Sequence, residues 1–94
     1  MVDADVAPHD HLKVVWEREK AQRFGDAVRH LRREAGLSQE ALAQQVGITK
    51  NHVQLLEAGR ASSRVDGPPS NPRMTTVYAL AAVLQVGPAE LLPE

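Results

Sequence analysis

The stretch LSQEALAQQVGITKNHVQLLEAG, residues 37–59, restricts the fold more than any other part of the chain. It contains two short runs with apolar side chains at helical spacing, separated by Gly47. Ser38 and Thr49 stand where N-caps belong, and a glycine follows each run, so both helices have start and stop signals. The connection between the two helices is very short, and such a turn forces a steep crossing.

The residues around this turn separate a buried part from an exposed part. Ala43 is small enough for a close crossing, and Gly47 can adopt the positive φ angle of a tight turn. Val53 and Leu56 then pack beneath the first helix and leave the first turn of the second helix projecting. That projecting turn contains four hydrogen-bonding residues: Thr49, Lys50, Asn51 and His52. The spacing therefore predicts a helix-turn-helix, whose projecting turn enters the major groove of DNA.

Helical periodicity also marks the rest of the chain, so we expect an all-α domain of five helices in a compact arrangement. Before the motif, one helix carries a stripe of core residues: Phe24, Val28, Leu31 and Ala35. After the motif, residues 60–73 contain three prolines and a glycine and are predicted to form a long loop.

Two further helices are expected after this loop. Thr75 or Thr76 is predicted to cap the first of them, which carries four inward-facing residues: Val77, Leu80, Ala81 and Leu84. Gly87 and Pro88 are predicted to start a short last helix anchored by Leu91 and Leu92.

The chain divides into two parts by composition. Residues 1–22 are expected to be an acidic N-terminal extension, partly helical, in which residues 1–8 are disordered. Asp10 is a candidate cap for a helix with three apolar residues on one face: Leu12, Val15 and Trp16. Residues 23–94 are expected to form the helix-turn-helix domain, with the motif at residues 38–59 and the long loop at residues 60–73.

Composition excludes several classes of protein. The 94 residues contain no cysteine, which excludes a disulfide framework and fits a reducing cytoplasm. No apolar run approaches the ~20 residues of a membrane span, and the N-terminus is acidic where a signal peptide is basic. We therefore expect a cytoplasmic protein with no membrane partner.

The charge is unevenly distributed along the chain. The formal net charge is −1, but residues 18–73 carry ten basic side chains against six acidic ones, which gives +4. Residues 1–17 carry −3 and residues 74–94 carry −2. A basic centre between acidic ends favours a nucleic-acid partner, although a mixed, solvated surface is the alternative interpretation.

The sequence gives little support for a metal site or for an enzyme active site. His9 and His11 alternate on a flexible end without a second pair of ligands nearby, so we expect no metal site. The sequence contains no glycine-rich phosphate loop and no recognisable nucleophile arrangement. We therefore expect neither an enzyme nor a cofactor.

Two segments resemble the lambda-repressor/Cro-like (XRE) family of helix-turn-helix transcriptional regulators. They are FGDAVRHLRREAGLSQEALAQQVGITKNHVQLLEAGR and, after the loop, NPRMTTVYALAAVLQVGPAELL, and together they cover most of the chain from Phe24 to Leu92. The most specific part of the resemblance is the joint spacing of six residues: Ala43, Gly47, Val53, Leu56, Glu57 and Gly59.

The resemblance implies roles for four residues that flank the base-reading turn. Ser38 caps the first motif helix and directs backbone N–H groups at a DNA phosphate. Gln39 opens that helix, and in such proteins its amide contacts the phosphate backbone or an adjacent base. Arg32 and Glu57 occupy positions that form a buried or semi-buried ion pair, which orients the recognition helix without touching bases.

The resemblance also places the base-reading residues at Thr49, Lys50 and Asn51. Asparagine fits the N6 and N7 edge of adenine and lysine fits the O6 and N7 edge of guanine, each worth ~1–3 kcal/mol of discrimination. We count His52 and Gln54 among the DNA-facing residues, although His52 also fits an ordinary solvated position. Leu55 either touches a thymine methyl group or packs against the core.

The loop departs from the family pattern because it is longer than the usual connection. Its arginines Arg60, Arg64 and Arg73 have two interpretations. They follow a phosphate strand or insert into a minor groove of double-stranded DNA. Alternatively, the loop is a surface excursion whose charges are only solvated.

The leading hypothesis is a sequence-specific DNA-binding regulator, a repressor that binds a pseudo-palindromic operator as a homodimer with half-sites ~34 Å apart. The dimer would use the last helices or the N-terminal extension, where Trp16 either contributes to the interface or folds onto its own core. Phage-type repressor, restriction–modification controller and antitoxin are not separated by the sequence. The alternative is a protein-interaction module that binds a toxin or a larger regulator, with weak DNA binding.

Overall fold

The computed structural model describes residues 16–94, which form four α-helices and one short 3₁₀ helix. In chain order these are α2 (Arg18–Glu34), α3 (Gln39–Val46), α4 (Lys50–Ala58), α5 (Met74–Leu84) and η1 (Pro88–Glu90). The predicted all-α class is confirmed, and a single antiparallel bridge between Arg60 and Pro69 is the β pairing found in these residues. The helix expected after Asp10 lies outside the described residues.

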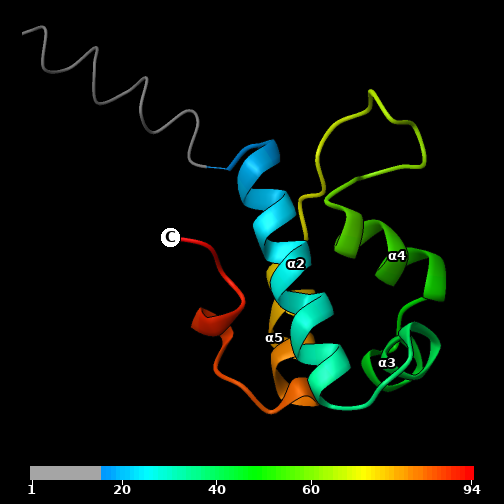
Figure 1. The fold of residues 1–94 in the computed structure, drawn as a ribbon, viewed down its shortest axis with the longest axis vertical. Helices are drawn as coiled ribbons and strands as arrows, with labels where there is room; N and C mark the ends of the chain where they lie inside the picture. The colour runs from blue at the N-terminus through cyan, green and yellow to red at the C-terminus, as the bar shows by residue number, and fades with distance from the viewer. Residues whose placement is uncertain (1–15) are drawn as a thin grey trace, which may run out of the picture.

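The helices surround one core (Figure 1). α4 packs against α2 and α3, while α5 packs against α3, α2 and η1. Figure 1 shows α3, α4 and the loop at residues 60–73 on one side of the molecule and the C-terminus on the other. The helix-turn-helix therefore forms one side of the domain.

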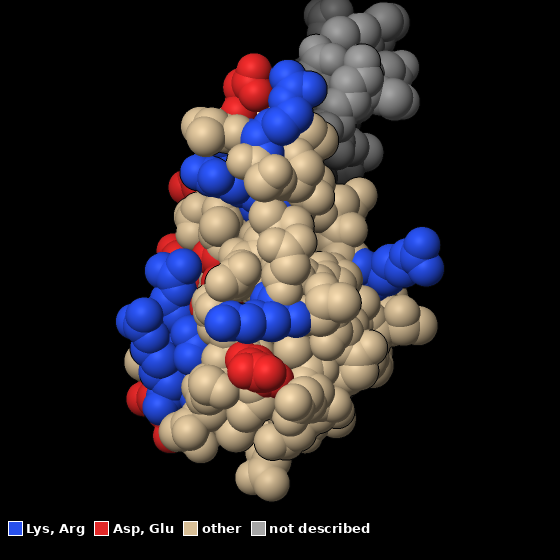
Figure 2. Space-filling view, turned by 90° about the vertical axis from the view of Figure 1, so that its right-hand side faces the viewer, with Lys and Arg blue, Asp and Glu red and all other residues tan. Residues whose placement is uncertain are grey.

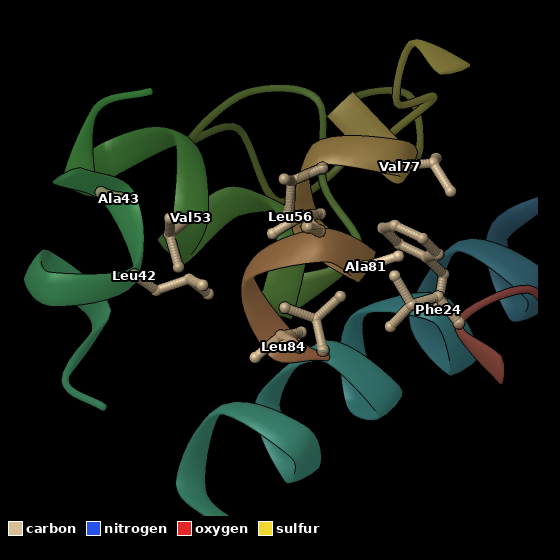
Figure 3. Packing of buried hydrophobic residues seen from close by; sticks show 11 residues of the cluster. Phe24, Leu42, Ala43, Val53, Leu56, Val77, Ala81 and Leu84 are labelled. Atoms are coloured by element: carbon tan, nitrogen blue, oxygen red, sulfur yellow. The ribbon is translucent and has the colours of Figure 1, made fainter. Parts of the chain in front are cut away.

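Each of the four α-helices contributes apolar side chains to this core, and Leu91 after η1 completes it (Figure 3). Its buried members are Phe24, Val28, Leu42, Ala43, Val53, Leu56, Val77, Leu80, Ala81, Leu84 and Leu91. Burial of these side chains is the main favourable term that holds helices this short in place, since an isolated helix below ~12–15 residues is marginal in water.

The helix before the motif ends earlier than expected. α2 begins at Arg18 and continues without a break past Phe24. Ala35, expected in the core stripe, is exposed because α2 ends at Glu34 and Gly36 then turns the chain with a φ of 73°. Leu31 is half-buried and packs at the edge of the core.

The predicted cap at Thr75 or Thr76 is wrong. The N-cap of α5 is Arg73, whose side chain makes no capping hydrogen bond. Pro72 disfavours the helical conformation for the residue before it, so the helix can begin as soon as the chain has passed this proline. Both threonines lie inside the first turn of α5.

The expected fifth α-helix is a three-residue 3₁₀ helix, η1. Pro88 lies in its first turn, and the Glu90 carboxylate accepts a hydrogen bond from the Gly87 N–H at 2.9 Å. Leu91 is buried and anchors this end, but Leu92 is 38% exposed, so only one of the two expected anchors reaches the core.

Candidate nucleic-acid interface

The turn between α3 and α4 occupies three residues. The N–H groups of Gly47 and Ile48 both donate to the Ala43 carbonyl, at 2.8 Å and 3.0 Å, which ends α3. Gly47 has a φ of 90°, a left-handed value that glycine adopts at little cost. The Thr49 hydroxyl then accepts from the His52 N–H at 3.0 Å and caps α4.

α2 approaches α4 very closely through Gly25. A Cβ atom at this position would collide with the backbone oxygens of Leu56 and Glu57. The missing side chain therefore allows the backbones of the two helices to meet, next to the carboxylate that links them.

Glu57 is completely buried in α4 and lies at the centre of a polar network. Arg32 of α2 holds it with two hydrogen bonds, Nε to Oε2 at 2.6 Å and Nη2 to Oε1 at 3.1 Å. Arg29 Nε lies 3.5 Å from Oε1, and the Gln39 amide donates to Oε1 at 3.0 Å. A third Arg32 nitrogen, Nη1, donates to the Leu37 carbonyl at 2.9 Å.

This network determines the ionisation of Glu57. Burial alone raises the pKa of a carboxyl group, but hydrogen bonds from Arg32 and Gln39 and the nearby guanidinium charge hold the pKa of Glu57 below its ordinary value of 4.5. The carboxylate is therefore ionised, and it ties α2 and the start of α3 to α4.

Gln39 makes a contact inside the protein that the family resemblance does not imply. Its side chain is half-buried and directs its amide nitrogen at Glu57, inside the protein. The second hydrogen of this amide and its oxygen remain available for a contact at the surface. Ser38 caps α3, since its hydroxyl accepts from the Ala41 N–H at 3.0 Å.

The first turn of α4 points away from the core. Thr49, Lys50, Asn51 and His52 are all exposed, and so is Gln54. By contrast, Val53 and Leu56 on the opposite face of the same helix are buried. Leu55 is half-buried and borders a concavity with His52, so it belongs to the edge of this surface.

An open concavity of about 460 Å³ lies beside the N-terminus of α3. Its lining residues come from α2, α3 and α4: Arg32, Arg33, Ser38, Gln39, Glu40 and Lys50. Arg33 is not among the residues predicted from the sequence. Its position as a basic residue in the last turn of the helix before the motif would have indicated it. The cationic groups and the helix N-terminus suit an anion.

A second concavity, of about 160 Å³, lies on the other side of α4 and faces the loop. It is bordered by side chains of α4 and of both ends of the loop: His52, Leu55, Leu56, Arg60, Ala61, Ser70, Asn71 and Pro72. Arg60 is half-buried here, whereas Arg64 is exposed near the tip of the loop and lies 3.4 Å from Asp66.

Figure 2 shows the side of the molecule that carries α3, α4 and the loop. Lys and Arg side chains gather along one edge of this face, and a largely uncharged area lies beside them. In the described part of the chain, no group of three or more metal-ligating side chains occurs, and no helix is long and apolar enough to cross a membrane. His9 and His11 lie outside the described residues.

A family model described as a helix-turn-helix domain matches residues 23–93. The chain belongs to the helix-turn-helix family of XRE-type transcriptional regulators. The restriction–modification controller protein C.AhdI from Aeromonas hydrophila is 32% identical, with a TM-score of 0.65 over 77% of this chain and 96% of that chain.

Two other solved structures are similar to this helix-turn-helix protein. The master regulator for biofilm formation SinR, solved in complex with DNA, is 25% identical, with a TM-score of 0.58 over 72% of this chain and 95% of that one. An HTH_3 family transcriptional regulator from Vibrio cholerae shares the fold, with 23% identity and a TM-score of 0.64 over 78% of this chain and 36% of that chain. A comparison with curated protein sequences gives no significant match.

Proposed function

We propose that this XRE-type regulator is a repressor that binds a pseudo-palindromic DNA operator as a homodimer. The observation that carries the proposal is the polar, exposed first turn of α4, which the buried Glu57 network holds outward from the core. A fixed, projecting helix N-terminus with hydrogen-bonding side chains is what the major groove admits.

The base-reading residues in this proposal are Thr49, Lys50 and Asn51. The Asn51 amide can both donate and accept, which matches N6 and N7 of adenine, and Lys50 donates to O6 or N7 of guanine. His52 and Gln54 are exposed on the same helix and are proposed to contact the edges of the site. A base pair that does not match costs about 1–3 kcal/mol at each position read.

The two concavities that flank α4 are proposed to lie over the two DNA strands. On one side, Arg33 lies near the N-cap Ser38, where its charge and the first N–H groups of α3 can bind a phosphate. Gln39 contributes there through the part of its amide that Glu57 does not occupy. On the other side, Arg60 and Arg64 supply positive charge from the loop.

A single domain reads few base pairs, so specificity requires two copies. The exposed apolar side chains that suit a contact between copies lie in α5 and after η1: Met74 and Tyr78 are each 59% exposed, and Leu92 is 38% exposed. Trp16, the other candidate, packs edge-on against Phe24 in its own core, which favours the C-terminal helices as the dimer interface.

The test is a selection of bound fragments from random DNA, at low and then at physiological salt. We expect an inverted repeat whose centre-to-centre half-site spacing is about one helical turn. Lys50→Ala and Asn51→Ala should each lose discrimination at one position of the half-site, while Lys20→Ala, which removes a lysine far from α4 in sequence, should retain it. An unaltered sequence preference in both α4 variants would remove the base-reading assignment.

The second candidate is a protein-interaction module that binds a toxin or a larger regulator. The near-zero net charge and the exposed Met74, Tyr78 and Leu92 favour it. Ionic strength separates the two functions, because DNA binding that neutralises several phosphates weakens steeply with salt and an apolar protein interface barely responds.

A further inference from the structure

The loop at residues 60–73 is closed at its base by backbone hydrogen bonds. The Ser70 N–H donates to the Gly59 carbonyl at 3.0 Å, and the Ala61 N–H donates to the Pro68 carbonyl at 3.1 Å. These bonds flank the bridge between Arg60 and Pro69. The segment between them is therefore a hairpin-like excursion with a fixed base.

Two side chains at the start of the described chain hold this loop from outside. The Trp16 indole Nε1 donates to the Ser70 carbonyl at 2.8 Å, and Arg18 Nη2 donates to the Gly67 carbonyl at 3.1 Å. Trp16 is itself fixed, because its ring meets the buried Phe24 ring edge-on with centroids 6.2 Å apart. We refer to Trp16 and Arg18 as the brace. Both acceptors are backbone carbonyls of the loop. The brace therefore fixes the path of the loop backbone without using contacts to the loop's side chains.

The braced loop lies where DNA backbone is expected. It projects on the same side of the molecule as α3 and α4, beyond the C-terminal end of α4 (Figure 1). A nine-residue helix is about 13 Å long, and the major groove is about 12 Å wide. When the first turn of α4 enters the groove, we expect a structure at its other end to reach the sugar–phosphate backbone that borders the groove. The exposed residue Arg64 is on this loop, 3.4 Å from the equally exposed Asp66.

We propose that Trp16 and Arg18 are positioning residues for DNA binding, and that they hold the loop as a pre-ordered wing whose Arg64 contacts a backbone phosphate. This inference rests on the proposed function and adds the region before residue 23 to the DNA-binding machinery. A loop that is already ordered loses less conformational entropy when it binds, so the contact made by Arg64 contributes more to affinity.

The test is a double-mutant cycle on the full chain, with the affinity for a selected DNA fragment measured by fluorescence anisotropy. We expect Arg64→Ala and Arg18→Ala to weaken binding by about threefold to tenfold each, with Arg18→Ala/Arg64→Ala little weaker than either single variant. Arg23→Ala is the matched control, since it removes an exposed α2 arginine that has no hydrogen bond or ion pair with other described residues, and it should cost less than about twofold.

A second variant and a second readout separate positioning from general stability. Trp16→Phe keeps an aromatic ring against Phe24 but removes the indole N–H, and it should weaken DNA binding without changing helicity. Trp16 is the single tryptophan of the chain, so its fluorescence reports the brace directly. In Arg18→Ala, acrylamide should quench it more strongly than in the wild-type protein.

Three results would overturn the inference. Additive losses in the double variant would show that Arg18 and Arg64 act independently. If Arg64→Ala binds DNA as tightly as the wild-type protein while Lys50→Ala loses binding, the loop is not a DNA-contacting wing, but the proposed DNA-binding function is retained. Absence of any specific binding by the wild-type protein would remove the proposed function together with the wing.

Discussion

At the scale of single residues, the ionised carboxylate of Glu57 links α4 to α2 and to the start of α3 and so contributes to the stability of the fold. Its pKa is lowered in the folded protein, so its contribution to stability is fully present above the ordinary value of 4.5 and is lost as the pH falls through the folded value. We expect Glu57→Gln to lower the free energy of unfolding by about 3 kcal/mol at pH 7, because it leaves the buried Arg32 without its counter-charge. Urea unfolding at a series of pH values measures this difference.

The same experiment checks the sign of the pH dependence. The gap between the wild-type protein and Glu57→Gln should begin to narrow below about pH 4.5, where the Glu57 carboxyl group of the unfolded chain takes up a proton, and should close as the pH falls through the lower pKa of the folded protein. Glu19→Gln is the control, since Glu19 is exposed on α2 and should change stability by less than about 0.5 kcal/mol. A gap that stays constant from pH 7 to pH 3 would contradict the assigned role of the charge.

Only part of the Glu57 network can be predicted from the sequence. The pairing of Arg32 with Glu57 follows from the family resemblance, because both positions belong to a recognisable spacing. The amide of Gln39 could not be placed in this way, since a side chain at the start of a helix can turn toward the surface or toward a buried acceptor, and only the position of Glu57 decides. The brace has no sequence signal at all, because its acceptors are backbone carbonyls of the loop.

At the scale of helices, two glycines should respond very differently to the same substitution. Gly25→Ala places a Cβ against the backbone of α4, and the helices must separate. The gain in helix propensity is about 0.5–1 kcal/mol, which is smaller than the about 2–3 kcal/mol expected for overpacking a close contact. We therefore expect a net loss of stability, measured by thermal or urea unfolding, together with weaker DNA binding because α4 moves.

Gly47→Ala tests the turn instead of the packing. A Cβ at this position meets no atom within 4 Å, so only the left-handed φ of 90° opposes the substitution. We expect a cost of about 1 kcal/mol, and Gly47→Asn should recover part of it because asparagine tolerates this conformation better. A larger loss for Gly47→Ala than for Gly25→Ala would mean that the turn, and not the contact between α2 and α4, limits stability.

Helix order and the motif itself are predictable because apolar spacing, caps and glycines agree there. The ends of α5 and η1 are not, because the controlling interactions are tertiary. Thr75 and Thr76 have the right chemistry for a cap, but the path of the chain after Pro72 starts the helix at Met74. Leu92 is as apolar as Leu91, but Leu91 takes the inward-facing position and Leu92 stays partly exposed.

At the scale of the whole molecule, the balance of charge on the DNA-facing side should govern affinity. Asp66 is exposed and lies 3.4 Å from Arg64, so it opposes the phosphates that the wing is proposed to approach. An exposed ion pair of this kind contributes little to stability, about 0–1 kcal/mol, so Asp66→Asn should leave the fold intact. We expect it to strengthen DNA binding by about twofold to fivefold at low salt, because Arg64 then meets the phosphates without a neighbouring negative charge.

The salt dependence distinguishes this local effect from a change in net charge. Glu94→Gln removes the same charge at the C-terminus, which lies on the other side of the molecule from α3 and α4 (Figure 1). Beyond the screening length of about 8 Å at physiological ionic strength, its effect should vanish, while that of Asp66→Asn should persist in part. Equal gains in both variants would mean that only the net charge matters and that the loop lies away from DNA. Weaker binding by Asp66→Asn would instead assign Asp66 to orienting Arg64, and the ion pair would then be part of the DNA contact.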